Sequence, residues 1–582
     1  MNGLLLFCIL TVAYMIAYKT YGGYLSKYIF QLNSKNDVPS QTLSDGQDYV
    51  PAQKQVLFGH HFTSIAGTGP IVGPAIGVIW GWGPALLWIF LGSIFMGAVH
   101  DLTTLVMSMR NQGKSIVDIS KKYTNHRVRF IFFIVVFLAL LIVIAIFGMV
   151  IALIFSQFPE SVFPVWFQIP IAIWLGRTVL NHGVYRKKMI VQALLLMILG
   201  IWLGMEMPLH LPRLGIPETG IWTIVLLMYA FFASVLPVHF LLQPRDLINA
   251  WQLYISLGLV VLGLVATGIS SGLPLVAPVI NMQAEGAPNM WPFLFITVAC
   301  GAISGFHCLI SSGTTSKQIK CETDAHFIGY GAMITEAFLA TVVIIAVSAG
   351  IGIAYESASG VLLTGRSAWD AHYGSWAASS GLGSKLTAVV VGCANMMSTL
   401  GISTQVGISI MGVFIASFAG TTLDSATRVQ RYILSEFISL TPLKGKLNKY
   451  AITAIAVLSA AMLAFSSGAD GKGALLLWPL FGAVNQLLGG LALLVGTLYL
   501  QKRGGRKWMV TAIPCLFLMI TSIWASLINQ IAFLQNGQSL LFLINGIIIG
   551  VSVLMSLEIG AISLRWRQAP SRPNQDVSGL SC

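Results

Sequence analysis

Long apolar segments alternate with short polar ones along nearly the whole chain. Segments of about 20 apolar residues are long enough to cross about 30 Å of hydrocarbon as α-helices. Strands of a membrane barrel would instead alternate in polarity over about 10 residues. The pattern therefore predicts an all-α polytopic membrane protein with about 15 transmembrane helices. These are expected at residues 3–19, 58–80, 84–109, 130–157, 163–179, 189–206, 221–237, 252–270, 292–313, 327–354, 386–421, 450–467, 474–500, 508–528 and 539–563.

One predicted helix contains the segment GHHFTSIAGTGPIVGP, residues 59–74, whose glycines and prolines interrupt a helix. Broken backbone at membrane depth persists only where protein or a water-filled cavity satisfies its polar groups. The freed carbonyls can bind a cation, and the amides of the second half-helix can bind a carboxylate. We therefore predict a substrate site here, although the same small residues also suit close helix packing. Its residues are Ala66, Gly67, Thr68, Gly69 and Pro70.

Two later segments run in the opposite direction and are also interrupted. The fifth predicted helix after 58–80 is 221–237, which breaks at Pro237, and 292–313 carries Gly301 and Gly305. Broken helices in matching positions of inverted repeats mark the substrate site in many secondary transporters. We assign Pro237, Gly301, Gly305 and His307 to the same substrate site. The predicted divisions are an N-terminal accessory helix and loop at 1–57, inverted five-helix repeats at 58–206 and 221–421, accessory helices at 450–563, and a cytoplasmic tail at 564–582.

Charge supports this topology. Only 9% of residues are charged, the net charge is +13, and alternating sides from an outside N-terminus puts 29 of the 33 Lys and Arg inside. That bias follows the positive-inside rule and predicts a cytoplasmic C-terminus. We therefore expect the lipid bilayer, and not nucleic acid, as the partner of this basic chain, and no obligate protein partner is evident.

Two acidic residues lie deep in predicted helices. Asp101 and Glu336 are each about 13 Å from the same membrane face, at 1.5 Å per residue. Intramembrane acids are functional by default, and we consider both for proton coupling. The alternative is a structural pair with a polar or basic partner. The hydroxyls of Ser311, Ser312 and Thr314 suit an oxygen cage for Na⁺, or else ordinary helix capping.

Several charged or titratable residues lie near the cytoplasmic mouth. His60, His61, Arg245 and Asp246 are candidate gate residues. The histidines are alternatively interfacial residues, or metal ligands together with His307 or Cys308. Arg245 and Asp246 are alternatively a local ion pair. No cofactor is expected beyond a coupling proton or Na⁺.

A further pair of opposite charges, Asp424 and Arg428, has the i, i+4 spacing of a helix-surface pair.

The chain contains no ATP-binding domain, so transport would be driven by an ion gradient or by the gradient of the solute itself. A solute sensor would need an output domain, which the chain also lacks. A membrane enzyme would need a convergent catalytic set. The spacing of His60, His61, Asp101 and His307 is unspecific in this respect, and we predict no enzyme.

Five blocks resemble signatures of the carbon starvation protein (CstA) family of bacterial inner-membrane transporters, over about residues 10–565. They are DGQDYVPAQKQVLFGHHFTSIAGTGPIVGPAIG, YAFFASVLPVHFLLQPRD, CGAISGFHCLISSGTTSKQIKCETDAHFIGYGAM, TTLDSATRVQRY and WPLFGAVNQLLGG. The resemblance implies gradient-driven uptake of peptides or pyruvate when carbon is scarce. It also implies membership of the amino acid–polyamine–organocation superfamily, with a leucine-transporter-like core. We expect a proton-coupled symporter. The alternatives are a Na⁺-coupled carrier of another small carboxylate or amino acid, and a solute sensor.

Overall fold

The computed structural model describes residues 2–46, 48–182, 187–212, 215–357, 359–376, 382–439, 441–442 and 444–568. Most of the tail predicted at 564–582 lies outside these residues. The described chain is mostly helical, and its one small sheet pairs β1 (Tyr355–Glu356) with β2 (Leu362–Leu363) in antiparallel fashion.

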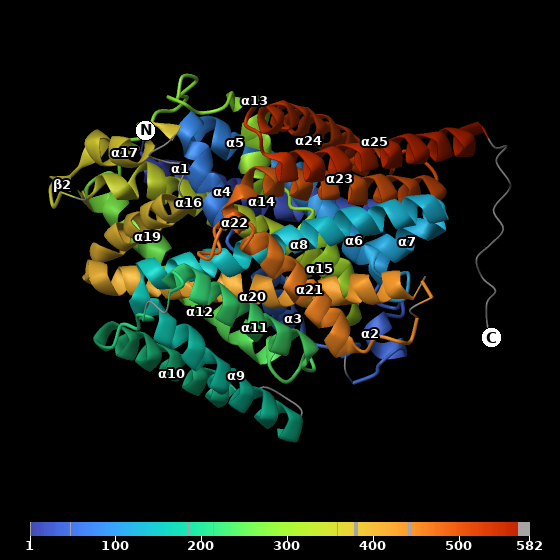
Figure 1. Cartoon of the computed structure of the whole chain (residues 1–582), viewed down its shortest axis with the longest axis horizontal. Coiled ribbons are helices and arrows are strands. Elements are labelled where there is room, and N and C mark those ends of the chain that lie inside the picture. The colour runs from blue at the N-terminus through green and yellow to red at the C-terminus, as the bar shows by residue number, and fades with distance from the viewer. Residues whose placement is uncertain are drawn as a thin grey trace.

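The helices are named in chain order (Figure 1). The first group is α1 Gly3–Ala17, η1 Tyr18–Gly22, η2 Leu25–Ile29, α2 Pro39–Thr42, α3 Lys54–Ala66, α4 Gly69–Gly77, η3 Val78–Trp80, α5 Trp82–Gly92, η4 Ser93–Gly97, α6 Ala98–Met109, α7 Ile116–Tyr123 and α8 His126–Gln157. The second is η5 Pro159–Ser161, α9 Val162–His182, α10 Lys187–Glu206, α11 Glu218–Val235, α12 Leu242–Ser270, α13 Met290–Thr297, α14 Ala299–Ala302, α15 Phe306–Gly313, η6 Thr315–Lys317, η7 His326–Tyr330, α16 Gly331–Ser348 and η8 Gly350–Gly352. The third is α17 Gly365–Tyr373, α19 Leu382–Ser398, α20 Thr404–Ile438, α21 Lys449–Ala464, α22 Gly473–Leu476, α23 Trp478–Lys502, α24 Met509–Gln535 and α25 Ser539–Gln568.

The fold is that of an all-α polytopic membrane protein. Among the described residues, 11 helices are long and apolar enough to cross a membrane, or up to 12 if the bent pair α3 and α4 forms one span. The predicted number of about 15 is therefore not confirmed. Part of the difference arises because the segment predicted at 292–313 is divided into the short helices α13, α14 and α15.

The single helix predicted at 386–421 is wrong. Two helices, α19 and α20, replace it and are joined by residues 399–403. Gly401 adopts a positive φ of 81°, which ends α19, and the Ser403 side chain accepts a hydrogen bond from the Val406 amide, which begins α20. Residues 398–405, STLGISTQ, are mostly polar and include Gly401, so the sequence carries a turn signal that the single predicted helix overran.

Loops rich in Lys and Arg meet at one end of the helix bundle, which we call the basic end. There Arg110 and Arg503 both donate to the Phe30 carbonyl, and Lys502 lies over the Tyr123 ring. At the opposite end, Trp80 packs beside Trp376.

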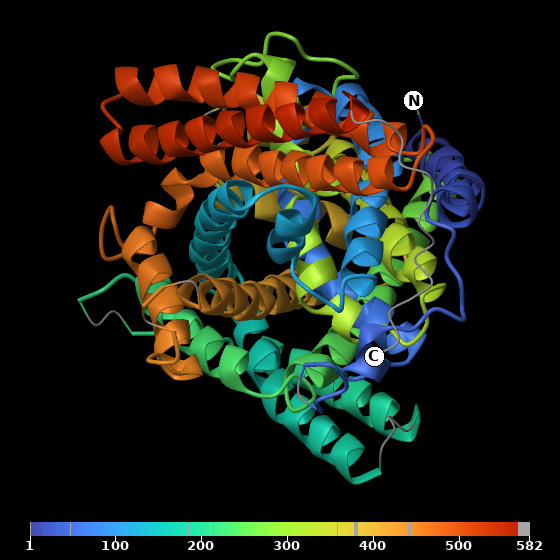
Figure 2. The ribbon, with the colours of Figure 1, turned by 90° about the vertical axis from the view of Figure 1, so that its right-hand side faces the viewer.

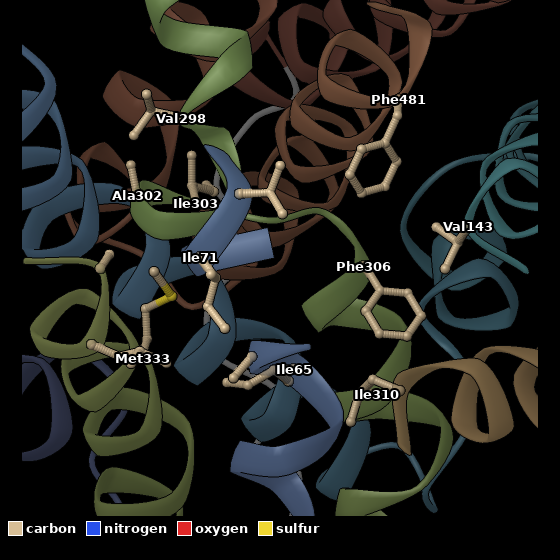
Figure 3. Packing of buried hydrophobic residues seen from close by; sticks show 14 of the residues in the cluster. Ile65, Ile71, Val143, Val298, Ala302, Ile303, Phe306, Ile310, Met333 and Phe481 are labelled. Atoms are coloured by element: carbon tan, nitrogen blue, oxygen red, sulfur yellow. The ribbon is translucent and has the colours of Figure 1, made fainter. Parts of the chain in front are cut away.

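The two interrupted segments cross the bundle in opposite directions and contact each other. Lys54 begins α3 beside Asp324 at the basic end, whereas Trp80 ends η3 at the opposite end, where its indole donates to the Pro288 carbonyl. The segment α13–α15 starts close to that second point and ends at the basic end. α4 packs against α13 and α14, and α3 packs against α15. Ile65, Ile71, Ile303 and neighbouring apolar side chains fill the space between them (Figure 3).

Long helices enclose this central pair. α8 packs along α20, and α12 packs against α3 and α20. The hairpin α9–α10 forms its own small apolar cluster against α11 and α12, and it protrudes from one side of the bundle (Figures 1 and 2). α24 and α25 cover the other side (Figure 2). The repeat boundaries 58–206 and 221–421 stay a prediction.

Candidate functional site

The first break lies where the sequence predicts it. α3 ends at Ala66, and Gly67 takes φ +45°, a conformation that favours glycine. A Cβ atom at Gly67 would lie 2.5 Å from the Thr422 hydroxyl oxygen of α20 and 2.9 Å from the Phe147 ring of α8. The whole stretch 57–82 is buried. The interrupted backbone is therefore enclosed by protein and is not exposed to lipid.

The second break lies between α14 and α15, at residues 303–305. The Gly305 amide donates to the Asn485 backbone carbonyl at 3.0 Å, and the Phe306 amide donates to the Asn485 side-chain oxygen at 2.9 Å. Asn485 of α23 thus satisfies free amides at the start of a half-helix. A carboxylate could accept hydrogen bonds from the same two amides.

Close packing explains several of the predicted glycines. A Cβ atom at Gly69 would lie 2.5 Å from Cys300 Cβ, and one at Gly73 would lie 2.6 Å from the Thr297 carbonyl oxygen. Gly301 packs on Pro74 and Ala340 in the same interface. The packing interpretation therefore holds for this interface, and the role of Ala66–Pro70 in substrate binding stays a prediction.

Pro237 does not join this group. α11 ends at Val235, and Pro237 is exposed in the turn that leads to α12, whereas the residues of the first break are buried. The predicted pairing of 221–237 with the first break is thus replaced by the contact of α3 and α4 with α13–α15. Pro237 follows the end of a helix at the basic end. Its lack of an amide hydrogen breaks no helical hydrogen bond there.

The two predicted intramembrane acids share one partner, His307 of α15. His307 Nδ1 lies 2.9 Å from Asp101 Oδ2, and His307 Nε2 lies 3.4 Å from Glu336 Oε2. Asp101 Oδ1 lies 2.8 Å from Nδ1 of its neighbour His100. All four side chains are fully buried. Each acid is predicted from the sequence separately, and the structure joins them through His307 into a line across α6, α15 and α16.

The predicted hydroxyl cage is dispersed. Ser312 Oγ accepts from the Ile116 amide and donates to the Cys308 carbonyl, and Thr314 donates to the Ile310 carbonyl. These are capping and back-bonding roles. Ser311 differs, because its buried Oγ has no hydrogen-bond partner among the described residues.

A different group of oxygens lies beside Gly67. Thr422 donates to the Ser64 carbonyl at 3.4 Å, and the Ser64 and Ser425 hydroxyls are 3.2 Å apart. None of these three residues is among those predicted from the sequence.

Both gate histidines are buried and engaged. His60 Nδ1 lies 2.5 Å from Asp246 Oδ2 of α12, and His61 Nδ1 lies 2.8 Å from the Thr315 hydroxyl of η6. These contacts link the first half-helix α3 to two other elements at the basic end. Within the described part of the chain, no group of three or more His, Cys, Asp or Glu is arranged to hold a metal ion.

The local ion pair considered between Arg245 and Asp246 is wrong. Arg245 is paired with Asp424 of α20, and Tyr229 of α11 contacts both of these residues. Arg428 likewise does not form the helix-surface pair with Asp424, because it donates to the carbonyls of Ala233 and Leu236.

The network around Arg245 extends through residues that the sequence analysis missed. Thr421 accepts from Arg245 at 3.0 Å and from Asn249 at 2.7 Å, and Asn249 accepts from Gln168 of α9 at 2.5 Å. One signal was available. Ser417, Thr421, Asp424 and Arg428 recur at spacings of three or four residues, which places them on one face of α20.

Two broken helices in contact, a line of buried ionisable groups at one break, and buried ion pairs at the basic end define a polytopic membrane protein of the transporter class. Residues 2–525 match the family model described as "Carbon starvation protein CstA". The chain belongs to this family.

Its relatives are similar over most of their length. A peptide transporter CstA of Campylobacter jejuni is 32% identical, with 90% of this chain and 80% of the relative covered. The pyruvate/proton symporter BtsT of Escherichia coli is 30% identical, with 88% and 79% covered. A peptide transporter CstA of Bacillus subtilis is 31% identical, with 96% of both chains covered.

Solved structures are more distant. The crystal structure of MhsT in complex with L-phenylalanine aligns with a TM-score of 0.47 at 14% identity, covering 82% of this chain and all of that one. A manganese transporter of Eremococcus coleocola aligns with a TM-score of 0.44 at 16% identity, covering 90% and 99%.

Proposed function

We propose that this protein is a proton-coupled symporter that imports a small carboxylate solute, a peptide or pyruvate, across the bacterial inner membrane. The names of its relatives support both solute classes and, for one of them, proton symport. The basic end is the cytoplasmic end in this proposal, in keeping with the positive-inside rule. The N-terminus is then outside and the C-terminus inside.

The observation that carries the proposal is the position of His307 between Asp101 and Glu336, at the start of the half-helix that follows the second break. Buried ionisable groups are costly in a membrane, and where they occur they commonly mark an ion or substrate pathway. A proton that binds to Asp101, His307 or Glu336 changes which of the two carboxylates is hydrogen-bonded to the His307 imidazole. Because Asp101, His307 and Glu336 belong to α6, α15 and α16, that change alters the contacts between three helices.

Solute binding follows from the amides of Gly305 and Phe306, which Asn485 now satisfies. A solute carboxylate would replace the two Asn485 oxygens with two of its own. The two amides keep an acceptor in this exchange, while the Asn485 oxygens that they release require water or another donor in their place. Residues Ala66–Pro70 of the first break lie in the neighbouring half-helices, which pack on α14 and α15.

Access from the basic end is controlled by paired charges. His60–Asp246 ties α3 to α12, and Arg245–Asp424 ties α12 to α20. Opening a path from this end to the breaks requires these buried pairs to separate, and their separation is costly unless water or solute replaces them.

A second candidate is Na⁺ coupling. It is favoured by the oxygens of Ser64, Thr422 and Ser425, which converge beside the break at Gly67. Oxygen ligands suit a hard cation of this kind.

The experiment is uptake by the purified protein in liposomes, with pH and Na⁺ gradients imposed separately and labelled pyruvate or glycylglycine as solute. Proton symport predicts accumulation with a pH gradient, acid outside, and none with Na⁺ alone. Accumulation that follows only the Na⁺ gradient would replace the proposal with the second candidate. Absence of counterflow for both solutes would contradict transport of either.

A further inference from the structure

A cavity of about 120 Å³ lies at the basic end, directly beyond the half-helix α15. A single water needs only about 10–15 Å³ of such space, so the cavity admits a small organic solute. It is bounded by the loop before α3, the α6–α7 connection, α15, η6 and α20. Its polar and charged lining residues are Tyr49, Lys114, Ser115, Ser312, Lys317, Tyr432 and Glu436.

Lys317 is the partly buried cation of this cavity, whereas Lys114 is exposed. Its Nζ lies 4.7 Å from the centre of the Tyr432 ring and 5.3 Å from that of Tyr49. Within the described part of the chain, no carboxylate lies within 4.0 Å of it. Burial lowers the pKa of Lys317, although Asp48 and Glu436 oppose that shift.

The nearby carboxylates are engaged elsewhere. Glu436 accepts from the Ser115 hydroxyl at 3.0 Å, and Asp48 accepts from the Tyr432 hydroxyl at 2.6 Å. Asp45 accepts from the backbone amides of residues 48 and 49. The Lys317 ammonium lies over two ring faces, and Asp48, Glu436 and Asp45 act on it only from beyond ion-pair distance. A partly buried ammonium of this kind gains from direct contact with an anion.

We infer that this cavity is a second binding site for the transported solute, in which Lys317 holds its carboxylate at the basic end. The inference rests on the proposed function, because it assumes that a carboxylate solute passes this end. Both pyruvate and a dipeptide carry the required group. The hydroxyl of Ser312 and the exposed ammonium of Lys114 at the rim lie on the same cavity.

The turn η6 connects this cavity to α3 and α6 through three consecutive residues, Thr315, Ser316 and Lys317. The Thr315 hydroxyl lies 2.8 Å from His61 of α3, and the Ser316 hydroxyl accepts from Ser108 of α6 at 2.8 Å. Lys317 follows and faces the cavity. A solute that draws Lys317 toward its carboxylate therefore pulls on a turn bonded to the first half-helix and to the helix that carries Asp101.

The test compares Lys317→Gln, Lys317→Arg and the control Lys320→Gln in right-side-out and inside-out membrane vesicles. Lys320 is exposed on the same connection, so it matches the change of charge outside the cavity. We expect Lys317→Gln to raise the half-saturating solute concentration at least tenfold on one membrane face only. Lys317→Arg should retain most of the affinity, and Lys320→Gln should match the wild type. An unchanged value on both faces, or an equal increase on both, would overturn the inference.

Equilibrium binding to the purified protein separates this inference from the proposed function. Wild-type and Lys317→Gln proteins are titrated with pyruvate, glycylglycine and inorganic phosphate. Loss of a pyruvate or glycylglycine site in Lys317→Gln supports the inference even if transport assays fail. Identical titrations of the two proteins, or a Lys317-dependent site that binds phosphate and neither solute, would contradict it.

Discussion

His307 and Asp101 lie 2.9 Å apart, Nδ1 to Oδ2, although 206 residues separate them and both are fully buried. His307 opens the half-helix after the second break, and Asp101 lies within a continuous helix. The contact therefore joins a half-helix that begins at a break in the chain to a helix that has no such break. In the proposed function, this pair and Glu336 on the other side of His307 carry the coupling proton.

Asp101→Asn should uncouple transport from the proton gradient. The amide cannot take up or release a proton, but it retains the shape of the side chain and can still contact His307. We expect accumulation driven by a pH gradient to fall at least tenfold while solute counterflow continues, measured in proteoliposomes. Asp370→Asn, at an exposed ion pair with Arg366, is the matched control. Full accumulation by Asp101→Asn would remove this residue from the coupling path.

Gly69→Ala should destabilise the contact between α4 and α14. The added Cβ would lie 2.5 Å from Cys300 Cβ and 2.8 Å from its sulfur, and overpacking of this kind costs about 1–3 kcal/mol. The double variant Gly69→Ala/Cys300→Gly should recover part of the loss, because it removes the atoms that clash. The measurement is thermal unfolding in detergent together with uptake.

Gly258→Ala provides the control for that experiment, since an added Cβ at Gly258 meets open space in the middle of α12. It should be neutral or slightly stabilising, because alanine favours a helix. Equal losses at positions 69 and 258, or no recovery in the double variant, would show that the clash with Cys300 is not the cause.

Arg245 and Asp424 should be strongly coupled in stability. Removing one partner leaves the other charge buried and unpaired, at a cost of about 3–5 kcal/mol. Arg245→Gln and Asp424→Asn should each lower the unfolding temperature, and the double variant should lose less than the sum of the two. Additive losses in this cycle would show that the pair contributes no coupling energy.

Acidification should loosen the extramembrane segment around α17. His372 is buried, its Nδ1 lies 3.3 Å from the Ser384 hydroxyl, and burial, assisted by Lys385, lowers its pKa to about 4. The unfolded state binds a proton near pH 6.5, so it gains stability relative to the native state as the pH falls from about 6.5 to 4. Above pH 6.5 the effect vanishes.

Hydrogen exchange over residues 365–373 measures this effect. Local opening should increase by up to about tenfold per pH unit below 6, after correction for the intrinsic exchange rate. His372→Gln should remove the dependence because the amide does not titrate. Equal pH dependence in both proteins would assign the effect to another group.

The sequence predicts the first break correctly because its cause is local. Gly67 needs a positive φ and Pro70 lacks an amide donor, and no distant residue is required to interrupt a helix there. Asp101 and Glu336 are identifiable for a related reason, since a charge in an apolar segment is costly wherever its partner lies.

The ion-pair partner of each charged residue could not be predicted from the sequence. Arg245 is next to Asp246 in the chain but pairs with Asp424, 179 residues away, and Asp246 pairs with His60. Both choices depend on how α12 packs between α3 and α20. The missed turn between α19 and α20 is a different case, because Gly401 and the polar residues around it are a local signal in the sequence.

In the proposed mechanism solute and proton cross the membrane together, and the proton is carried by Asp101, His307 and Glu336. The most direct measurement is the internal pH of proteoliposomes, followed with a trapped dye, when pyruvate or glycylglycine is added outside in the absence of any imposed gradient. We predict acidification inside the liposomes with the wild type and none with Asp101→Asn. Solute uptake by the wild type with no change in internal pH would contradict the account.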